Sequence, residues 1–147
     1  MIKRIRILIL GGDNTPEPDP EQERRAVTAA LLIQAALMDG HFDQFERDMI
    51  ESLLYGEFGL SQEEAHQLMV DAEQAVHGSA HLFGFTRIAT ATLSHQDCVD
   101  LVEMLWLVVY ADGKLDELEA NLLLRVASLL NVTDRESALA RQRALGN

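Results

Sequence analysis

Two short acidic segments of the chain share one pattern of residue types and spacing. MDGHFDQFE, residues 38–46, and ADGKLDELE, residues 111–119, both read D-G-x-φ-D-x-φ-E, where φ is an apolar residue. Ca²⁺ and Mg²⁺ prefer oxygen ligands, so clustered carboxylates beside a glycine turn have the chemistry of a divalent-cation site. The sequence therefore offers six candidate metal ligands, which are Asp39, Asp43, Glu46, Asp112, Asp116 and Glu119.

Helix capping is a second explanation for some of these acids. In the first segment Asp43 stands at an expected N-cap and Glu46 completes a capping box three residues later. The leading acid, Asp39, comes instead at the expected C-terminal end of a helix, where the helix dipole disfavours a negative charge. Asp-Gly is also a common turn pair. Capping and turn formation on one side, and metal binding on the other, thus remain alternative explanations.

The candidate metal site does not follow the EF-hand pattern. Its loop is too short, and the glycine directly follows the first aspartate, whereas an EF-hand places it five residues later. Two arrangements stay open. Either both acidic segments meet in one site, or each forms a weak half-site of its own.

Capping signals predict seven helices and no strand. Pro20 suits a first helical position, and the helix that it starts is expected to run to about Met38. Gly84 and several threonines lower the helix propensity of residues 81–93, so that helix has the weakest sequence signal of the seven. The expected helices begin near Pro20, Asp43, Ser61, His81, Ser94, Asp116 and Thr133.

The acidic segments belong to a longer internal repeat. An offset of 73 residues carries Leu32 to Leu105 and Asp39 to Asp112, and FGLSQEE later corresponds to LNVTDRE at an offset of 72. Neither half alone would bury its apolar faces. We therefore expect an all-α bundle of about seven helices, made of two pseudo-twofold three-helix repeats joined by a central helix.

Composition and charge limit the class of protein. With 147 residues and 48% hydrophobic side chains, the chain is long and apolar enough for one compact domain, expected over residues 21–147. Its formal charge of -12 argues against nucleic acid and favours a cation or a basic partner. The single cysteine, Cys98, excludes an internal disulfide and a cysteine-rich zinc site, and we expect a cytoplasmic protein.

The first twenty residues form a separate segment. MIKRIRILIL, residues 1–10, is basic and apolar but too short to span a bilayer, and it lacks the features of a secretory signal. GGDNTPEPDP, residues 11–20, contains all three prolines and suits a linker. Residues 1–10 have three possible uses, which are contact with a membrane surface, docking on a partner, or packing on their own domain.

Other candidate groups carry weaker signals. His77 and His81 are four residues apart, but Gly78 lies between them and is expected to break the helix. His95 near Cys98 would favour a reactive thiol, whereas a lone cysteine in an apolar helix is usually a core residue.

Trp106 and Tyr110 lie four residues apart in MLWLVVYA, residues 104–111, which is apolar on every side. Stacking on a ligand is one use for these rings. We expect core packing instead, because a helix without a polar face belongs inside a bundle.

The two acidic segments, the intervening HLFGFTRI and the string W-x-x-x-Y-A-D-G-x-L-D-x-x-E resemble the TerB-like family, tellurite resistance protein B and its relatives. The resemblance runs from about Glu21 to Arg143. It implies an all-helical bundle of about seven helices and a binding module linked to tellurite and other chemical stress. It also implies divalent-metal chelation by the six acids named above, and a related domain occurs in membrane-anchored DnaJ-like co-chaperones.

We therefore expect a non-enzymatic TerB-like module that binds a divalent cation, Ca²⁺ or Mg²⁺, and acts in a stress-response complex. The alternative is a metal-free acidic scaffold for protein partners, with residues 1–10 contacting a partner or the inner membrane face. A third interpretation, a hydrolase with paired carboxylates, would need a pocket between the acidic segments and a carboxyl pKa raised toward neutrality. The sequence predicts neither the partners nor the oligomeric state.

Overall fold

The computed structural model describes residues 19–38, 42–77, 82–110 and 117–146. Within these ranges it is entirely helical and contains no strand. The described helices are α2 (Pro20–Met38), α3 (Gln44–Phe58), α4 (Gln62–His77), α5 (Leu82–Thr92), α6 (His95–Val109), α7 (Glu117–Leu129) and α8 (Asp134–Ala144). The seven expected helices and the all-α class are confirmed.

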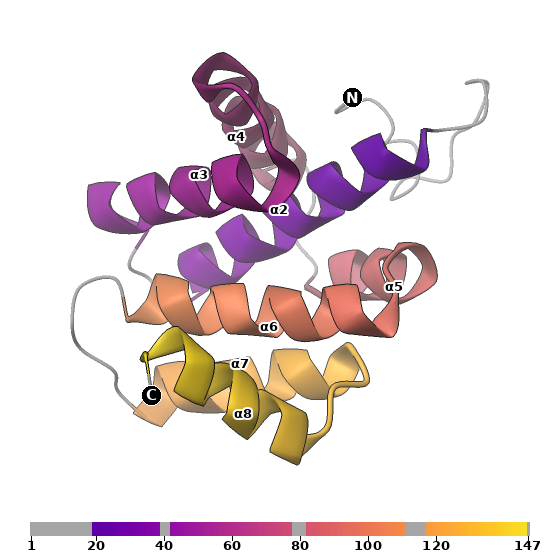
Figure 1. Ribbon diagram of the computed structural model, residues 1–147, viewed down its shortest axis with the longest axis vertical. Coiled ribbons are helices and arrows are strands. Elements are labelled where there is room, and N and C mark those ends of the chain that lie inside the picture. Colours follow the sequence, from indigo (N-terminus) through magenta and orange to yellow (C-terminus); the bar gives the residue numbers. More distant parts are fainter. Residues whose placement is uncertain (1–18, 39–41, 78–81, 111–116, 147) are drawn as a thin grey trace.

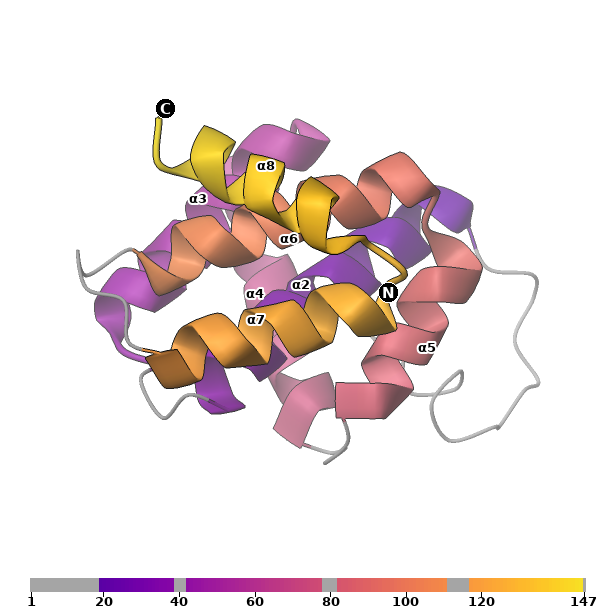
Figure 2. The same ribbon diagram turned by 90° about the horizontal axis from the view of Figure 1, so that it is seen from below.

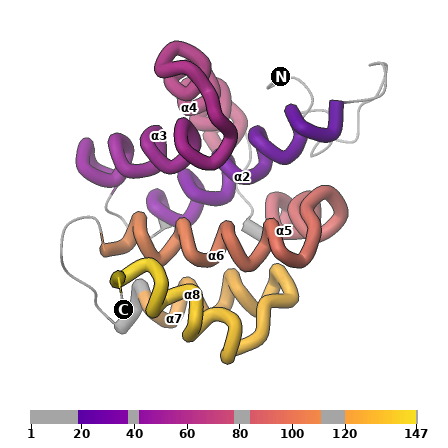
Figure 3. The backbone as a smooth tube through the Cα atoms, viewed as in Figure 1, coloured from indigo at the N-terminus to yellow at the C-terminus, as the bar shows by residue number. Residues whose placement is uncertain are grey.

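Two buried helices organise the bundle (Figures 1 and 2). α2 packs against α3, α4, α5 and α6, while α6 packs against α8 and α7 and also touches α3 and α5. In Figure 3, α6 lies between α7 and α8 on one side and α2, α3 and α4 on the other. Every residue of α2 from Ala26 to Ala36 is buried, because this stretch is almost wholly apolar.

Side-chain caps fix where the helices start. At α6, the Ser94 hydroxyl accepts the Asp97 N–H at 3.0 Å, and the Asp97 carboxylate accepts the Ser94 N–H at 3.2 Å. Such reciprocal bonds satisfy donors that the first helical turn leaves unpaired. Equivalent boxes at α4 and α8 use Ser61 with Glu64 and Thr133 with Glu136.

The predicted repeat has a local counterpart at the ends of α3 and α7. Gly59 and Asn131 both take the left-handed backbone conformation, with φ of 61° and 62°. The next residues, Leu60 and Val132, are buried, and each donates its N–H to a carbonyl five residues earlier, at 3.2 and 2.8 Å. Both turns therefore end a helix by the same Schellman-type bonding.

The helix pairs that pack in one half also pack in the other. α2, α3 and α4 all contact one another, and so do α6, α7 and α8. This agrees with the expected three-helix units. The pseudo-twofold relation between the units is not defined by these contacts and stays a prediction.

The aromatic pair of α6 is part of the core, as expected. Trp106 is 2% exposed, and its ring centroid lies 6.3 Å from that of half-buried Tyr110. The Arg141 guanidinium of α8 lies 5.0 Å from the centre of the Trp106 ring and donates a 2.9 Å hydrogen bond to the Tyr110 hydroxyl. One basic side chain therefore covers both rings, and it fastens α8 to α6.

Tertiary packing explains why α5 forms despite its weak helix propensity. Phe85, Thr86 and Ala89 are all buried, and α5 packs mainly against α2. Burial of a phenylalanine side chain contributes about 2 to 3 kcal/mol, which exceeds the roughly 1 kcal/mol cost of a helical glycine such as Gly84.

Candidate functional site

The six candidate metal ligands are unevenly covered by the structure. We call the acidic segments 38–46 and 111–119 the first and second acidic corners. Asp43 and Glu46 lie in the first corner, at the start of α3, and both side chains are described. Glu119 lies in the first turn of α7, where only the backbone is described. The other three acids lie outside the described residues and are Asp39, Asp112 and Asp116.

Asp43 is the N-cap of α3, as the sequence predicts. Its backbone is extended, with φ of -92° and ψ of -176°, and its Oδ1 accepts the Glu46 N–H at 2.9 Å. The Asp43 side chain is exposed, whereas Glu46 is only 5% exposed. Both carboxylates lie at the positive end of the α3 dipole, which stabilises negative charge.

A basic residue holds this corner against the neighbouring helix. Arg47 forms an ion pair with Glu73 of α4, and its guanidinium lies 5.6 Å from the centre of the Phe42 ring. The first turn of α3 is thus fixed by a cap, an ion pair and an aromatic contact. These contacts fix the position of the first turn of α3, with the Asp43 side chain exposed and the Glu46 side chain buried.

The part of the corners that is described does not by itself form a metal site. Across residues 19–38, 42–77, 82–110 and 117–146, no three His, Cys, Asp or Glu side chains form a group that would hold an ion. The described pair, Asp43 and Glu46, supplies two of the three ligands expected in the first corner. Metal binding at the corners therefore stays a prediction, as does a site shared between them.

The weaker candidate groups of the sequence analysis were the pair Cys98 and His95 and the pair His77 and His81. Cys98 is 3% exposed, and burial raises the pKa of its thiol, so the idea that His95 activates this thiol is wrong. His95 lies instead beside Glu136, with 2.7 Å between Nε2 and Oε2. His77 is exposed at the end of α4, and its suggested partner His81 lies outside the described residues.

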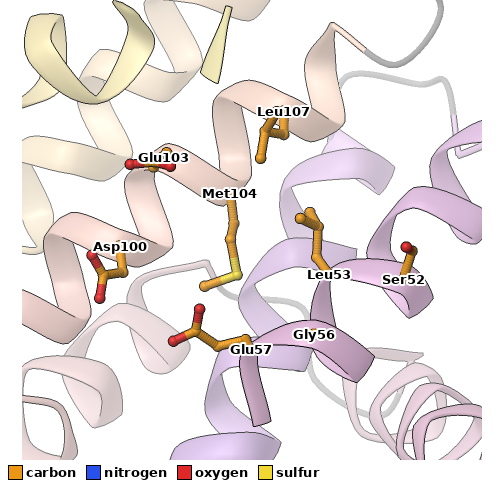
Figure 4. A pocket seen from close by; sticks show the side chains of 8 residues that line it. All are labelled: Ser52, Leu53, Gly56, Glu57, Asp100, Glu103, Met104 and Leu107. Carbon is orange, nitrogen blue, oxygen red and sulfur yellow. The ribbon is translucent and has the colours of Figure 1, made fainter. Parts of the chain in front are cut away.

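A second acidic feature, which the sequence did not reveal, lies between α3 and α6 (Figure 4). It is a groove of about 360 Å³. Met104 reaches from α6 toward Glu57 of α3, and Leu53 lies beside it, so apolar side chains separate the acids. The residues that line it are Ser52, Leu53, Gly56, Glu57, Asp100, Glu103, Met104 and Leu107.

Negative charges in the groove act on one another. Glu57 is exposed overall, but partial desolvation of its carboxyl raises its pKa, the nearby Asp100, Asp97 and Glu103 raise it further, and Arg24 opposes them. Glu103 is paired with Arg143 of α8, with 2.6 Å between Oε1 and Nε. Asp100 accepts a 3.0 Å hydrogen bond from the Gln96 amide. The sequence offered one signal, since Asp100 and Glu103 are three residues apart on one helix face.

Arg24 joins three helices at one end of the groove. Its Nε and Nη2 donate to the two oxygens of Asp97 at 3.2 and 3.1 Å, and Nη1 donates to Glu21 at 2.5 Å. Its guanidinium also lies 5.7 Å from the centre of the Phe58 ring. The N-terminal part of α2 is thereby attached to the end of α3 and the start of α6.

Comparison with protein families decides the identity. The family model described as tellurite resistance protein TerB matches residues 25–142, which is most of the chain. The chain belongs to the TerB family. The matched residues include both acidic corners and all the residues that define the groove. The resemblance found in the sequence is therefore confirmed.

TerB membership relates the chain to tellurite resistance, and the family is generally non-enzymatic. No curated protein and no solved structure matches the chain. None of the TerB helices described here is long and apolar enough to cross a membrane.

Proposed function

We propose that this TerB protein is a non-enzymatic, cytoplasmic module that binds a divalent cation, Ca²⁺ or Mg²⁺, at its acidic corners. It would act with protein partners in a complex that responds to tellurite or other chemical stress. The observation that supports this most is the geometry of the first corner. Exposed Asp43 and buried Glu46 share the first turn of α3, directly after the turn sequence that contains Asp39.

Capping does not use up the acceptor capacity of Asp43. Its Oδ1 accepts the Glu46 N–H, but an ionised carboxylate offers about four lone-pair sites. An N-cap aspartate is therefore able to bind a cation as well. Ca²⁺ takes six to eight oxygen ligands, so Asp39 and backbone carbonyls would have to join Asp43 and Glu46. The second corner repeats the same three acids in the sequence.

Calorimetric titration of Ca²⁺, Mg²⁺ and Mn²⁺ into chelator-treated protein tests this proposal. We expect saturable heat with at least one of these ions. Asp39→Asn combined with Asp112→Asn removes the leading acid of both corners, so the affinity should fall at least tenfold. Asp134→Asn is the matched control, because Asp134 is an exposed acid in the first turn of α8, outside the corner pattern. Equal affinities for all three proteins would refute cation binding at the corners.

The groove supports a second candidate function. With no cation bound, the protein would be an acidic scaffold that binds basic protein segments, while residues 1–10 contact a partner or the inner membrane face. The apolar side chains and three carboxylates between α3 and α6 suit a segment that is both apolar and basic. This alternative predicts no calorimetric heat from any of the three ions, and a thermal unfolding midpoint that chelator leaves unchanged.

A further inference from the structure

The groove between α3 and α6 has two properties that an occupant would have to match, an apolar lining and an excess of negative charge. Half-buried Leu53 and Met104, which is 7% exposed, line the groove with apolar atoms, and Gly56 leaves space on the α3 side, because a Cβ placed there would meet nothing within 4 Å. Acidic side chains outnumber basic ones around it. Three arginines, Arg24, Arg25 and Arg143, pair with or lie near five carboxylates in and beside the groove, those of Glu21, Glu57, Asp97, Asp100 and Glu103. An occupant that is both basic and apolar would match the lining and the charge.

We propose that residues 1–10 of this chain, MIKRIRILIL, dock in this groove. The segment carries three cations, at Lys3, Arg4 and Arg6, and its other residues are apolar. Its positive charge is opposite in sign to the local excess of two carboxylates over arginines. Apolar contact with Leu53 and Met104 adds the hydrophobic term, and the cations relieve the repulsion among Glu57, Asp100 and Glu103.

The helix that follows the N-terminal segment and its linker begins close to the groove. α2 begins at Pro20, and Arg24 in its second turn binds Asp97 and covers Phe58. Asp97 is one helical turn from Asp100, and Phe58 directly follows Glu57. The chain that precedes α2 therefore starts near the Glu57 end of the groove.

The linker is long enough for docking within one molecule. Residues 11–19 are nine residues long, which allows a reach of up to roughly 28 Å at about 3.1 Å per residue. Along α6, the distance from Asp100 to Leu107 is only about 10 Å at 1.5 Å per residue. Docking in cis also avoids most of the entropy cost that a separate partner would pay. It would withhold residues 1–10 from membranes and other proteins, and it does not depend on cation binding at the corners.

Zero-length carbodiimide cross-linking of the full chain, followed by peptide mapping, tests the docking. The reagent joins a lysine amine to a carboxylate in direct contact, and Lys3 and Lys114 are the only lysines. We expect links from Lys3 to Glu57, Asp100 or Glu103 in the monomer fraction. These links should be at least fivefold more abundant than links from Lys3 to Glu63 or Asp134, which are exposed acids that do not line the groove.

Two variants that keep Lys3 separate the contributions. Gly56→Leu fills the groove, so it should reduce the links from Lys3 to Asp100 at least fivefold. Gly84→Leu is the matched control, since it changes a helical glycine with open space around it on α5. Arg4→Glu with Arg6→Glu reverses two charges and should reduce the same links to a similar extent, as should 0.5 M salt.

Three results would overturn the proposal. One is a spread of Lys3 links over carboxylates on all faces of the bundle, or no Lys3 link at all. Another is linkage between chains only, which would assign the groove to a second copy. The third is equal linkage in Gly56→Leu and Gly84→Leu.

Discussion

Replacing Arg24 with glutamine should destabilise the bundle by about 1 to 2 kcal/mol at neutral pH. The side chain makes two charge-assisted hydrogen bonds to Asp97, at 3.2 and 3.1 Å, and its guanidinium lies 5.7 Å from the centre of the Phe58 ring. Hydrogen bonds to charged groups contribute about 1.5 to 3 kcal/mol when buried. Arg24 and Asp97 are 31% and 23% exposed, so solvent screening reduces this range.

The pH dependence of the Arg24 effect follows from Asp97. Burial acts to raise the pKa of this carboxyl, but hydrogen bonds from the Ser94 N–H and hydroxyl and from Arg24 together lower it below its usual value. A carboxyl with a lowered folded-state pKa stabilises the fold above its unfolded-state pKa, about 3.9, and loses that contribution as the pH falls through the folded-state pKa. The cost of Arg24→Gln should therefore be the same at pH 7 and pH 5 and decrease in stronger acid.

Urea unfolding measures these differences, with Trp106 fluorescence as the probe, because the only tryptophan is 2% exposed. Arg25→Gln is the matched control, since its ion pair with Glu21 is 3.7 Å long, and it should cost less. A double-mutant cycle with Asp97→Asn should give a coupling of about 1 kcal/mol. Equal costs for Arg24→Gln and Arg25→Gln, or zero coupling, would refute the assignment of Arg24 as the tie between α2 and α6.

Three further predictions concern stability, each measured by urea unfolding. Gly59→Ala should cost about 1 kcal/mol because φ is 61°, and Gly59→Asn should cost less, since Asn131 adopts the same conformation in α7's C-terminal turn. In the Arg4→Glu, Arg6→Glu background, where the proposed docking is lost, Glu57→Gln should stabilise the protein at pH 7 by at most about 0.5 kcal/mol, since Glu57 is exposed and solvent screens its repulsion; the gain should disappear in acid because its raised pKa makes only the ionised form unfavourable, and destabilisation would contradict this. Leu105→Ala should cost about 3 kcal/mol, since Leu105 is fully buried, and exposed Leu124→Ala under about 1 kcal/mol; similar costs would refute the assigned core.

Capping chemistry made the helices predictable from the sequence. Ser94 with Asp97 and Thr133 with Glu136 form reciprocal boxes at the predicted starts of α6 and α8. These signals are local, since the residues that make the bonds are three apart in the chain. The apolar stretch around Trp106 was likewise readable as core, because it has no polar face.

Features that join distant parts of the chain were not predictable in this way. Glu57 and Asp100 are 43 positions apart, and only the packing of α3 on α6 brings them to one groove. The contact of Arg24 with Asp97 depends in the same way on how α2 lies against α6. Neither has a periodic or motif signal, since each pair is made by tertiary structure.

The acidic corners were predictable only in part. The role of Asp43 as the α3 cap was predictable, because it depends on Glu46 three residues later. Binding of an ion requires the leading acids as well, and Asp39 and Asp112 lie outside the described residues.

Counting bound ions tests the central claim most directly. The full chain, freed of metal by chelation and then dialysed against micromolar Ca²⁺ or Mn²⁺, is analysed for protein-bound metal by mass spectrometry. Cation binding at the corners predicts one or two ions per chain, lost in Asp39→Asn with Asp112→Asn and retained in Asp134→Asn. No bound ion in the unaltered protein, or the same number in all three proteins, would contradict it.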